Sequence, residues 1–195
     1  MKFFIIHLIF INFIFSNDII PPAHFSKWEI LQPEPNYVAW TNYGKFQWCK
    51  AKSIIPAPIK KVQNIIENKK NYPNVFKRIE KIAINSNDEV HIILDMPFPF
   101  YGRDYIVKYS KIMEKNDVIY KFHAVKNTAI PKNDNYVRLV NAAGEWRLHS
   151  IDAQNTELIY IWNGELLGDF PEWALTQAWT TQGKEVMSWI KDAIK

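Results

Sequence analysis

The chain has 195 residues, of which 48% are hydrophobic and 15% aromatic, and its formal net charge is +4. This composition excludes an intrinsically disordered chain, and the length suits one globular domain with a sizeable core. The basic residues form only short pairs such as Lys60-Lys61, which argues against a nucleic-acid partner. The small positive excess would favour transient contact with an anionic membrane surface, although a merely solvated surface explains it more simply.

Residues 1–16 have the composition of a secretory signal peptide. Lys2 gives a short positive start, and Phe3–Phe15 is an almost unbroken apolar run that is too short for a standard membrane-spanning helix. We therefore expect cleavage after this segment, an exported protein (periplasmic or secreted) and a single folded domain over residues 17–195. Ile14 is bulkier than the residue usually found near a cleavage site, so an uncleaved membrane anchor is the alternative.

Residues 17–44 are rich in proline and polar residues, and one short helix is predicted over Ser26–Leu31. Phe46–Ile55 has the pattern of a strand. Ala57–Lys70 has prolines at its start and apolar residues three or four apart, which predicts a helix. Tyr72-Pro73 is expected to end that helix, because the residue before a proline disfavours helical backbone.

Short strands joined by polar turns dominate the middle of the chain. Their spacing is typical of an antiparallel meander, in which strands that follow each other in sequence pair in space. The predicted strands are Phe76–Ile84, Glu89–Met96, Arg103–Met113, Val118–Val125, Tyr136–Ser150 and Thr156–Trp162.

A long helix is predicted over Glu172–Ile194, directly after Pro171. Leu175, Trp179 and Val186 fall on one stripe of it, as expected of a helix with one buried face. The order of strand, helix, about six antiparallel strands and long helix predicts an α+β fold, in which a curved sheet packs against the C-terminal helix. Because these elements carry bulky aromatic side chains, an apolar cavity is expected between them.

The stretch Met96–Tyr109 interrupts the meander. Two prolines in it lack backbone donors, so no continuous central strand runs through them. Gly102 allows either a sharp turn or a close backbone approach. From Arg103 the chain alternates again as a new strand, and Arg103 and Asp104 point to opposite faces. Since an unpaired buried charge is costly, one of the two is expected to have a dedicated partner.

Four segments together resemble the START domains, the steroidogenic-acute-regulatory-related lipid-transfer family. They lie in the family's order: Ala57-Pro58-Ile59 at the start of the first helix, PFPFYGRDYIVKY as the Pro-aromatic bend followed by Arg-Asp, Gly144–Leu148 as the Gly-x-Trp-x-Leu strand, and Asn163–Trp173 as the entry to the last helix. The resemblance implies a helix-grip fold, a curved antiparallel sheet wrapped around the C-terminal helix, with a tunnel for one lipid or other hydrophobic molecule. Sterol-binding members carry a second cavity arginine where this chain has Tyr109, so the resemblance does not extend to a sterol site.

Two arginines and a set of aromatic residues are the candidates for ligand contact. The full set is Phe98, Arg103, Tyr105, Val107, Tyr109, Arg138, Trp146, Trp162, Trp179 and Met187. Arg103 or Arg138 would select the head group of a ligand, since a partly buried guanidinium needs an anionic or carbonyl partner. For Arg103 the alternative is a purely structural role with Asp104 in locking the bend. For the tryptophans the alternative is core packing.

The function expected from these residues is binding of a lipid or other hydrophobic small molecule, with transfer as a further step. No catalytic residue, metal ligand set or cofactor is expected, because the chain carries no nucleophile elbow or phosphate-cradling loop and its five histidines lack metal spacing. Two alternatives stay open: a polyketide-cyclase-like helix-grip enzyme with a polar cavity, and a non-catalytic envelope interaction protein whose cavity is collapsed by aromatic side chains.

Overall fold

The computed structural model describes residues 19–126 and 129–195. The expected signal peptide, residues 1–16, lies outside the described residues. None of the helices in the described part of the chain is both long enough and apolar enough to span a membrane.

Ten strands form one mostly antiparallel sheet in the described ranges. The sheet order is β1-β2-β3-β10-β9-β7-β6-β5-β4, and β8 pairs in parallel with β6. The strands are β1 (Glu29–Gln32), β2 (Tyr37–Tyr43), β3 (Phe46–Ile55), β4 (Ile79–Ile84), β5 (Val90–Leu94), β6 (Gly102–Glu114), β7 (Asp117–Ala124), β8 (Tyr136–Arg138), β9 (Ala143–Ser150) and β10 (Thr156–Asn163).

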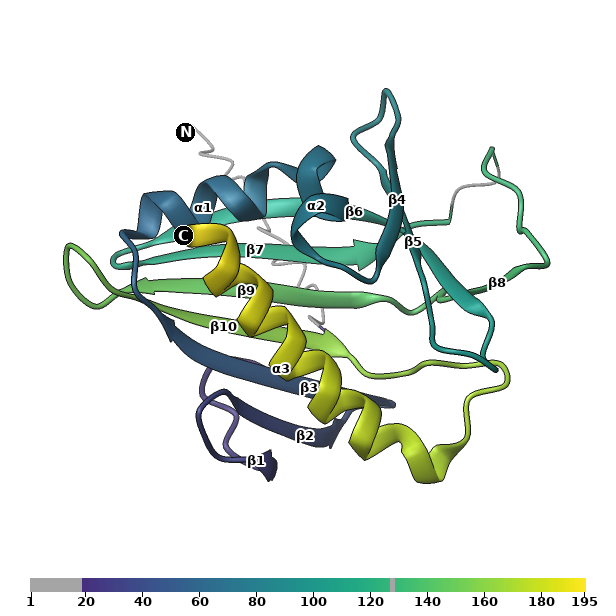
Figure 1. Ribbon diagram of the computed structural model, residues 1–195, viewed down its shortest axis with the longest axis horizontal. Coiled ribbons are helices and arrows are strands. Elements are labelled where there is room, and N and C mark those ends of the chain that lie inside the picture. Colours follow the sequence, from purple (N-terminus) through teal and green to yellow (C-terminus); the bar gives the residue numbers. More distant parts are fainter. Residues whose placement is uncertain (1–18, 127–128) are drawn as a thin grey trace, which may run out of the picture.

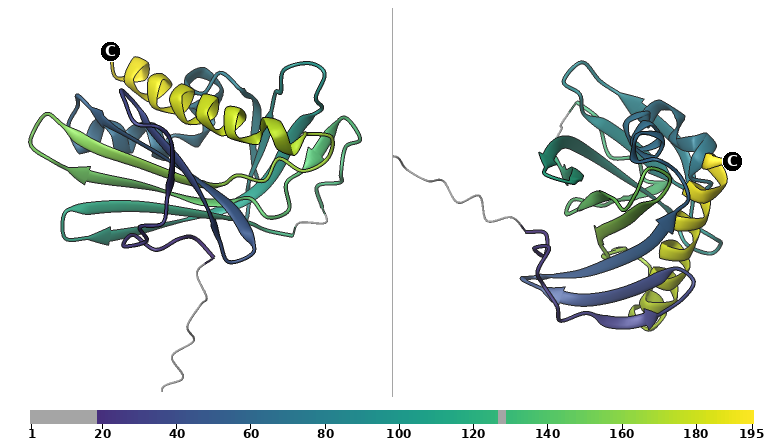
Figure 2. Two further views of the ribbon diagram at one scale, coloured as in Figure 1. Left: turned by 90° about the horizontal axis from the view of Figure 1, so that it is seen from below. Right: turned by 90° about the vertical axis from the view of Figure 1, so that its left-hand side faces the viewer.

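The helices all lie on one side of this sheet. Helix α1 (Ile59–Glu67), the short η1 (Lys69–Asn71) and α2 (Tyr72–Val75) connect β3 to β4, and η2 (Glu172–Ala174) leads into α3 (Leu175–Ile194). Figure 1 shows α3 crossing the sheet diagonally, with α1 and α2 along one edge. The turned views in Figure 2 show the sheet curving around α3. The α+β helix-grip fold predicted from the sequence is confirmed.

Helix α3 approaches one half of the sheet so closely at Gly183 that only a glycine fits there. A Cβ added at Gly183 would lie 2.8 Å from a methyl carbon of Val38 on β2 and 3.3 Å from the Cβ of Ala51 on β3. Val38 and Ala51 are fully buried there. The glycine therefore brings the helix against β2 and β3, while the opposite half of the concave face carries large aromatic rings.

The convex face of the sheet has an apolar cluster of its own. Ile20 packs there against Trp48, Ala143 and Ile161, and all four side chains are buried. In the left view of Figure 2 the first described residues run along this outer side, opposite α3. The N-terminal segment therefore covers the back of the sheet.

Three element predictions were wrong. The helix expected at Ser26–Leu31 is replaced by strand β1, because the backbone there pairs with β2, itself unpredicted. Tyr72-Pro73 opens the short helix α2 instead of ending a helix, since proline is accepted in the first turn of a helix. The long strand expected over Tyr136–Ser150 is two strands, β8 and β9, separated by a turn in which Ala142 donates to the Leu139 carbonyl.

A candidate ligand cavity under the C-terminal helix

A cavity of about 420 Å³ lies between the concave face of the sheet and α3. Its wall is built from α2, strands β4 to β7, β9 and β10, the bend Asp95–Phe100, η2 and the following half of α3. Most of the lining side chains are apolar or aromatic. Its volume falls in the range of roughly 300–1,000 Å³ that is usual for small-molecule pockets.

Stacked aromatic rings form the floor of the cavity. Trp146 on β9 and Tyr160 on β10 face each other in the strand register, and their ring centroids are 3.9 Å apart. Tyr160 stacks in turn on Trp162, at 4.8 Å. Gly144, opposite Trp162, leaves room for this arrangement, because a Cβ there would lie 2.6 Å from the ring of Phe122. The rings line the cavity and do not fill it.

The helix side of the cavity is more polar. Gln177 and Thr181 of α3 line it and are exposed. Arg78, between α2 and β4, also lines the cavity and donates two hydrogen bonds to Glu185 of α3, at 2.6 and 2.8 Å. Such a bidentate pair fixes both distance and direction. It ties the middle of α3 to the start of β4.

Arg103 is fully buried, but its guanidinium points at backbone and not at the cavity. Its Nε donates to the carbonyl oxygen of Leu166 at 2.9 Å, and Nη2 donates to the carbonyl of Leu167 at 2.9 Å and to Asp169 Oδ1 at 3.1 Å. Nη1 donates to the carbonyl of Tyr101. Burial lowers the pKa of Arg103, and Asp169 opposes that effect. Arg103 therefore clamps the loop before η2 onto the start of β6.

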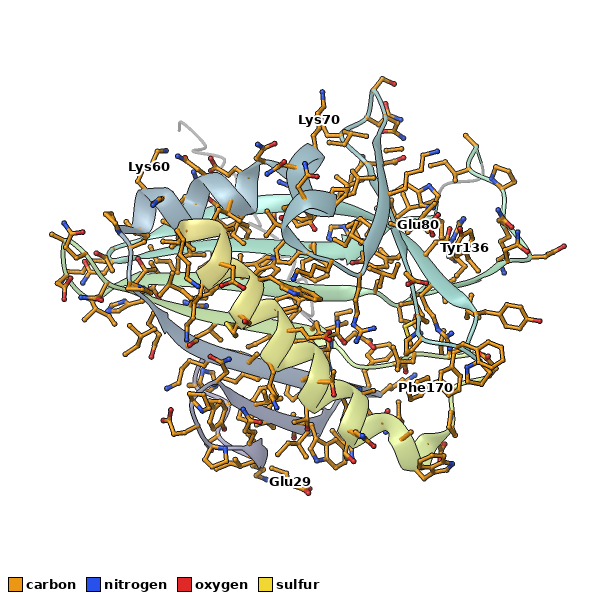
Figure 3. All side chains as sticks on the ribbon, viewed as in Figure 1. Glu29, Lys60, Lys70, Glu80, Tyr136 and Phe170 are labelled. Atoms are coloured by element: carbon orange, nitrogen blue, oxygen red, sulfur yellow. The ribbon has the colours of Figure 1, made fainter. Side chains whose placement is uncertain are left out.

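The clamped loop has an unusual backbone. Leu167 has φ +52° and Gly168 has φ +61°, so two successive residues adopt the left-handed conformation. That conformation is unfavourable for leucine, and the bond from Arg103 to its carbonyl helps to hold it. Phe170, labelled near the start of α3 in Figure 3, packs on Phe100 of the bend with centroids 4.6 Å apart. Bend and loop thus form one rim of the cavity.

Asp104 points to the opposite face of β6 and holds a separate ion-pair network. Arg138 donates from Nε to Asp104 Oδ1 at 2.8 Å and from Nη2 to Oδ2 at 2.7 Å, and His91 Nε2 also lies 2.7 Å from Oδ2. Burial alone would raise the pKa of Asp104, but the hydrogen bonds with Arg138 and His91 outweigh it and hold the pKa below its ordinary value. These contacts tie β8 to β6 and β5 behind the cavity.

The structure brings some of the predicted site residues together and separates the rest. The cavity is lined by Tyr105, Tyr109, Trp146 and Trp162. Val107, Trp179 and Met187 are buried in the core beside it. Phe98 is 96% exposed at the tip of the bend.

Neither arginine lines the cavity, so the prediction that one of them meets a ligand head group there is not supported by the geometry. For Arg103 the structural alternative fits, because its donors are used by the carbonyls of the loop. For Arg138, the single strand expected over Tyr136–Ser150 is interrupted by the turn between β8 and β9, so Arg138 and Trp146 lie on different strands. Arg138 consequently shares a face with Asp104.

Several lining residues were not among the predicted site residues. Tyr160 lies two residues from Trp162 on β10, and Phe122 lies four residues from Val118 on β7, so each pair shares one face of its strand. Strand periodicity therefore carried a usable signal for Tyr160 and Phe122. Tyr72 carried none, because its place depends on a short helix that the sequence did not predict.

No family model matches the chain. StAR-related lipid transfer protein 7, mitochondrial, is 30% identical over 63 residues in the Mus musculus protein and 22% identical over 125 residues in the Homo sapiens protein. These matches cover 31% and 58% of this chain but only 17% and 34% of the two relatives. The chain therefore spans well under half of the curated relatives it matches.

Solved structures match over most of the chain. Human StAR-related lipid transfer protein 5 superposes with a TM-score of 0.79 at 12% identity, covering 86% of each chain. A STAR-related lipid transfer protein from Xanthomonas axonopodis gives 0.74 at 14% identity, covering 87% of this chain and 99% of that one. The Zhui aromatase/cyclase from Streptomyces sp. R1128 gives 0.53 at 15% identity, covering 75% and 92%.

These likenesses show that the chain has the helix-grip fold. Within that fold class, the chain has the fold of the START-domain lipid-transfer proteins. The resemblance drawn from the sequence motifs is confirmed at the level of the fold.

Proposed function

We propose that the protein binds a lipid or other hydrophobic small molecule in the cavity under α3. The observation that carries the proposal is the cavity of about 420 Å³ with its floor of stacked aromatic rings. Moving an apolar chain from water into such a cavity is favourable by about 0.8 kcal/mol for each buried methylene. About ten methylenes therefore supply on the order of 8 kcal/mol before the entropy cost of association.

Native mass spectrometry tests the proposal most simply. The protein is purified without detergent, its mass is measured under native and denaturing conditions, and the solvent extract is analysed for lipids. The proposal expects a native mass increment that disappears on denaturation and a matching hydrophobic compound in the extract. If apolar probes added in excess also leave the native mass unchanged, the proposal fails.

We further propose that the protein transfers its ligand at membrane surfaces. Large apolar side chains are exposed on the rim and on the adjoining η2: Phe98 is 96% exposed on the bend, Tyr101 is 59% exposed directly after it, and Trp173 is 82% exposed on η2. Tyr101 and the loop before η2 are joined by a hydrogen bond from its backbone N–H to Asp169, at 3.4 Å. Exposed aromatic groups beside a cavity entrance suit contact with the membrane interface.

Vesicle co-sedimentation tests this contact. Phe98→Ser with Trp173→Ser should lower binding to phosphatidylcholine vesicles and slow ligand transfer between them. Ile54→Ser is the matched control, because Ile54 is 57% exposed on β3 and lies outside the rim. Equal transfer by all three proteins would remove the rim from the mechanism.

An enzyme of the cyclase type is the second candidate, and the fold relative Zhui aromatase/cyclase is its support. The ionisable lining residues favour binding instead. Burial raises the pKa of Tyr105 and of Tyr160, so both phenols stay protonated near neutral pH and neither can serve as a general base. Glu165 accepts a hydrogen bond from Asn141 Nδ2 at 3.0 Å. Turnover of a bound polyketide-like probe into a new product would replace the binding proposal with the enzymatic one.

We also propose that the protein is exported and that its mature form begins near residue 17. The support is the apolar run Phe3–Phe15 together with the burial of Ile20, which is 5% exposed in the outer apolar cluster. Cleavage after Ser16 would leave Ile20 and its packing in the outer apolar cluster intact. N-terminal sequencing of the exported fraction checks this, and Met1 retained on membrane-bound material would support the anchor instead.

A further inference from the structure

Four tyrosines from three elements converge on the part of the cavity next to α2. Tyr72 comes from α2, Tyr105 and Tyr109 from β6, and Tyr160 from β10, and all four line the cavity. They are close enough to affect one another electrostatically: beyond the larger effect of burial, Tyr72, Tyr105 and Tyr160 each raise the pKa of Tyr109. The aromatic wall is therefore not uniformly apolar but carries a group of hydroxyls.

Two of these hydroxyls are committed within the protein. Tyr72 donates to the carbonyl oxygen of Ile66 at 2.7 Å, and Tyr109 hydrogen-bonds to the Tyr72 hydroxyl. Within residues 19–126 and 129–195, neither Tyr105 nor Tyr160 makes a side-chain hydrogen bond. Tyr160 is only 8% exposed. Both residues line the cavity, so a hydroxyl that finds no partner in the protein can take one supplied from inside the cavity.

The charged lining residues are engaged elsewhere or exposed. Arg78 is held by both carboxylate oxygens of Glu185, Glu165 is bonded to Asn141, and Asp95 is exposed. The described part of the cavity lining therefore offers no cation free of a carboxylate partner, and Lys69, whose Nζ lies 4.4 Å from the ring centroid of Tyr109, is not one of the lining residues. A neutral phenol both donates and accepts, which suits the oxygen of an uncharged group.

We propose that Tyr105 and Tyr160 form the polar subsite of the cavity and bind the hydroxyl or carbonyl oxygen of an otherwise apolar, uncharged ligand. This inference rests on the proposed binding of a hydrophobic molecule and narrows its class. The aromatic stack from Tyr160 to Trp162 contacts the hydrocarbon part, and the two phenols select a neutral oxygen over an anionic head group.

Three probes with the same ten-carbon chain separate these contributions: decanol, chlorodecane and decyl phosphate. Their affinities are measured by competition against one fluorescent apolar probe, for the wild type and for Tyr105→Phe, Tyr160→Phe and the double variant. Each substitution removes a hydroxyl and keeps the ring. Tyr43→Phe is the matched control, because Tyr43 lies on β2 and packs in the convex-face cluster. Thermal unfolding of every variant verifies the fold.

The wild type should bind decanol more tightly than the other two probes. Each single variant should weaken decanol binding by about three- to tenfold, the loss expected for one hydrogen bond, and leave chlorodecane binding unchanged. Equal losses for decanol and chlorodecane, no loss for decanol, or tightest binding of decyl phosphate would each overturn the inference while leaving the proposed function standing. If the wild type binds none of the three probes, the proposed function falls and the inference with it.

Discussion

Arg103 shows how a buried charge can be structural beside a ligand cavity. Its guanidinium donates to three backbone carbonyls and to Asp169, and all of these acceptors lie on the rim formed by the bend and the loop before η2. The compact ammonium of a lysine cannot reproduce such a set of donors, because only the planar guanidinium presents several N–H groups in fixed directions.

We predict that Arg103→Met lowers the free energy of unfolding by about 3–5 kcal/mol, since it leaves buried acceptors without donors. Arg103→Lys should recover only part of that loss. Urea denaturation followed by tryptophan fluorescence measures both. If a variant keeps the stability of the wild type but no longer binds decyl phosphate, Arg103 has a ligand-binding role instead of a structural one.

Asp104 predicts a specific dependence of stability on pH. Its pKa is lower in the folded protein than the ordinary value of 3.8, because the bonds with Arg138 and His91 outweigh burial. A depressed carboxylate pKa stabilises the folded state above the unfolded pKa, and this contribution disappears as pH falls through the folded pKa. Wild type should therefore lose stability steadily below about pH 4.

Asp104→Asn is the variant that isolates this contribution. It should be less stable than wild type at pH 7, and the difference should shrink as the pH falls below 4. Thermal unfolding at a series of pH values provides the measurement. A constant difference across the whole range would show that the charge of Asp104 contributes nothing.

At the scale of elements, the cavity depends on where α3 touches the sheet and where it does not. Gly183 lets the helix lie directly on Val38 and Ala51, so the helix is anchored at β2 and β3. On the other half of the sheet, rings such as Trp146 and Tyr160 keep the helix away. A side chain at position 183 would therefore push α3 away from β2 and β3.

We predict that Gly183→Ala destabilises the protein by about 1–2 kcal/mol, although alanine favours a helix by about 1 kcal/mol. The added Cβ meets Val38 at 2.8 Å, and valine has no flexible end that can move aside. Combining it with Val38→Ala should cost less than the sum of the two single changes. Stabilisation by Gly183→Ala alone, as helix propensity would give, would contradict the close contact.

The elements that the sequence predicted best were those with clear periodicity. The stripe of Leu175, Trp179 and Val186 predicted α3, and alternation predicted β3 and β6, because the burial of these residues follows the local pattern. The errors arose where tertiary pairing decides. β1 exists only because β2 pairs with it, and α2 is a single turn with its proline in the first positions.

At the scale of the whole molecule, the sequence predicted several aromatic residues of the cavity wall but not the place of the two arginines. The aromatic residues Tyr105, Tyr109, Trp146 and Trp162 were recovered, because strand parity decides which face they share. The polar end was assigned to arginines, since a charge on an inner face suggests a head-group contact. The loop whose carbonyl accepts the hydrogen bond of Arg103 Nε lies sixty-three residues further along the chain. No local sequence pattern reveals a contact over that separation.

The space under α3 is proposed to hold an apolar ligand, and filling that space with a larger side chain tests this proposal most directly. Ala178 of α3 lines the cavity, whereas Ser188 of the same helix is exposed. Affinity for chlorodecane should fall at least about tenfold in Ala178→Trp, because the indole displaces the chain, and stay at the wild-type value in Ser188→Trp. Both variants should unfold within a few degrees of wild type. Wild-type affinity in a folded Ala178→Trp protein would contradict the claim.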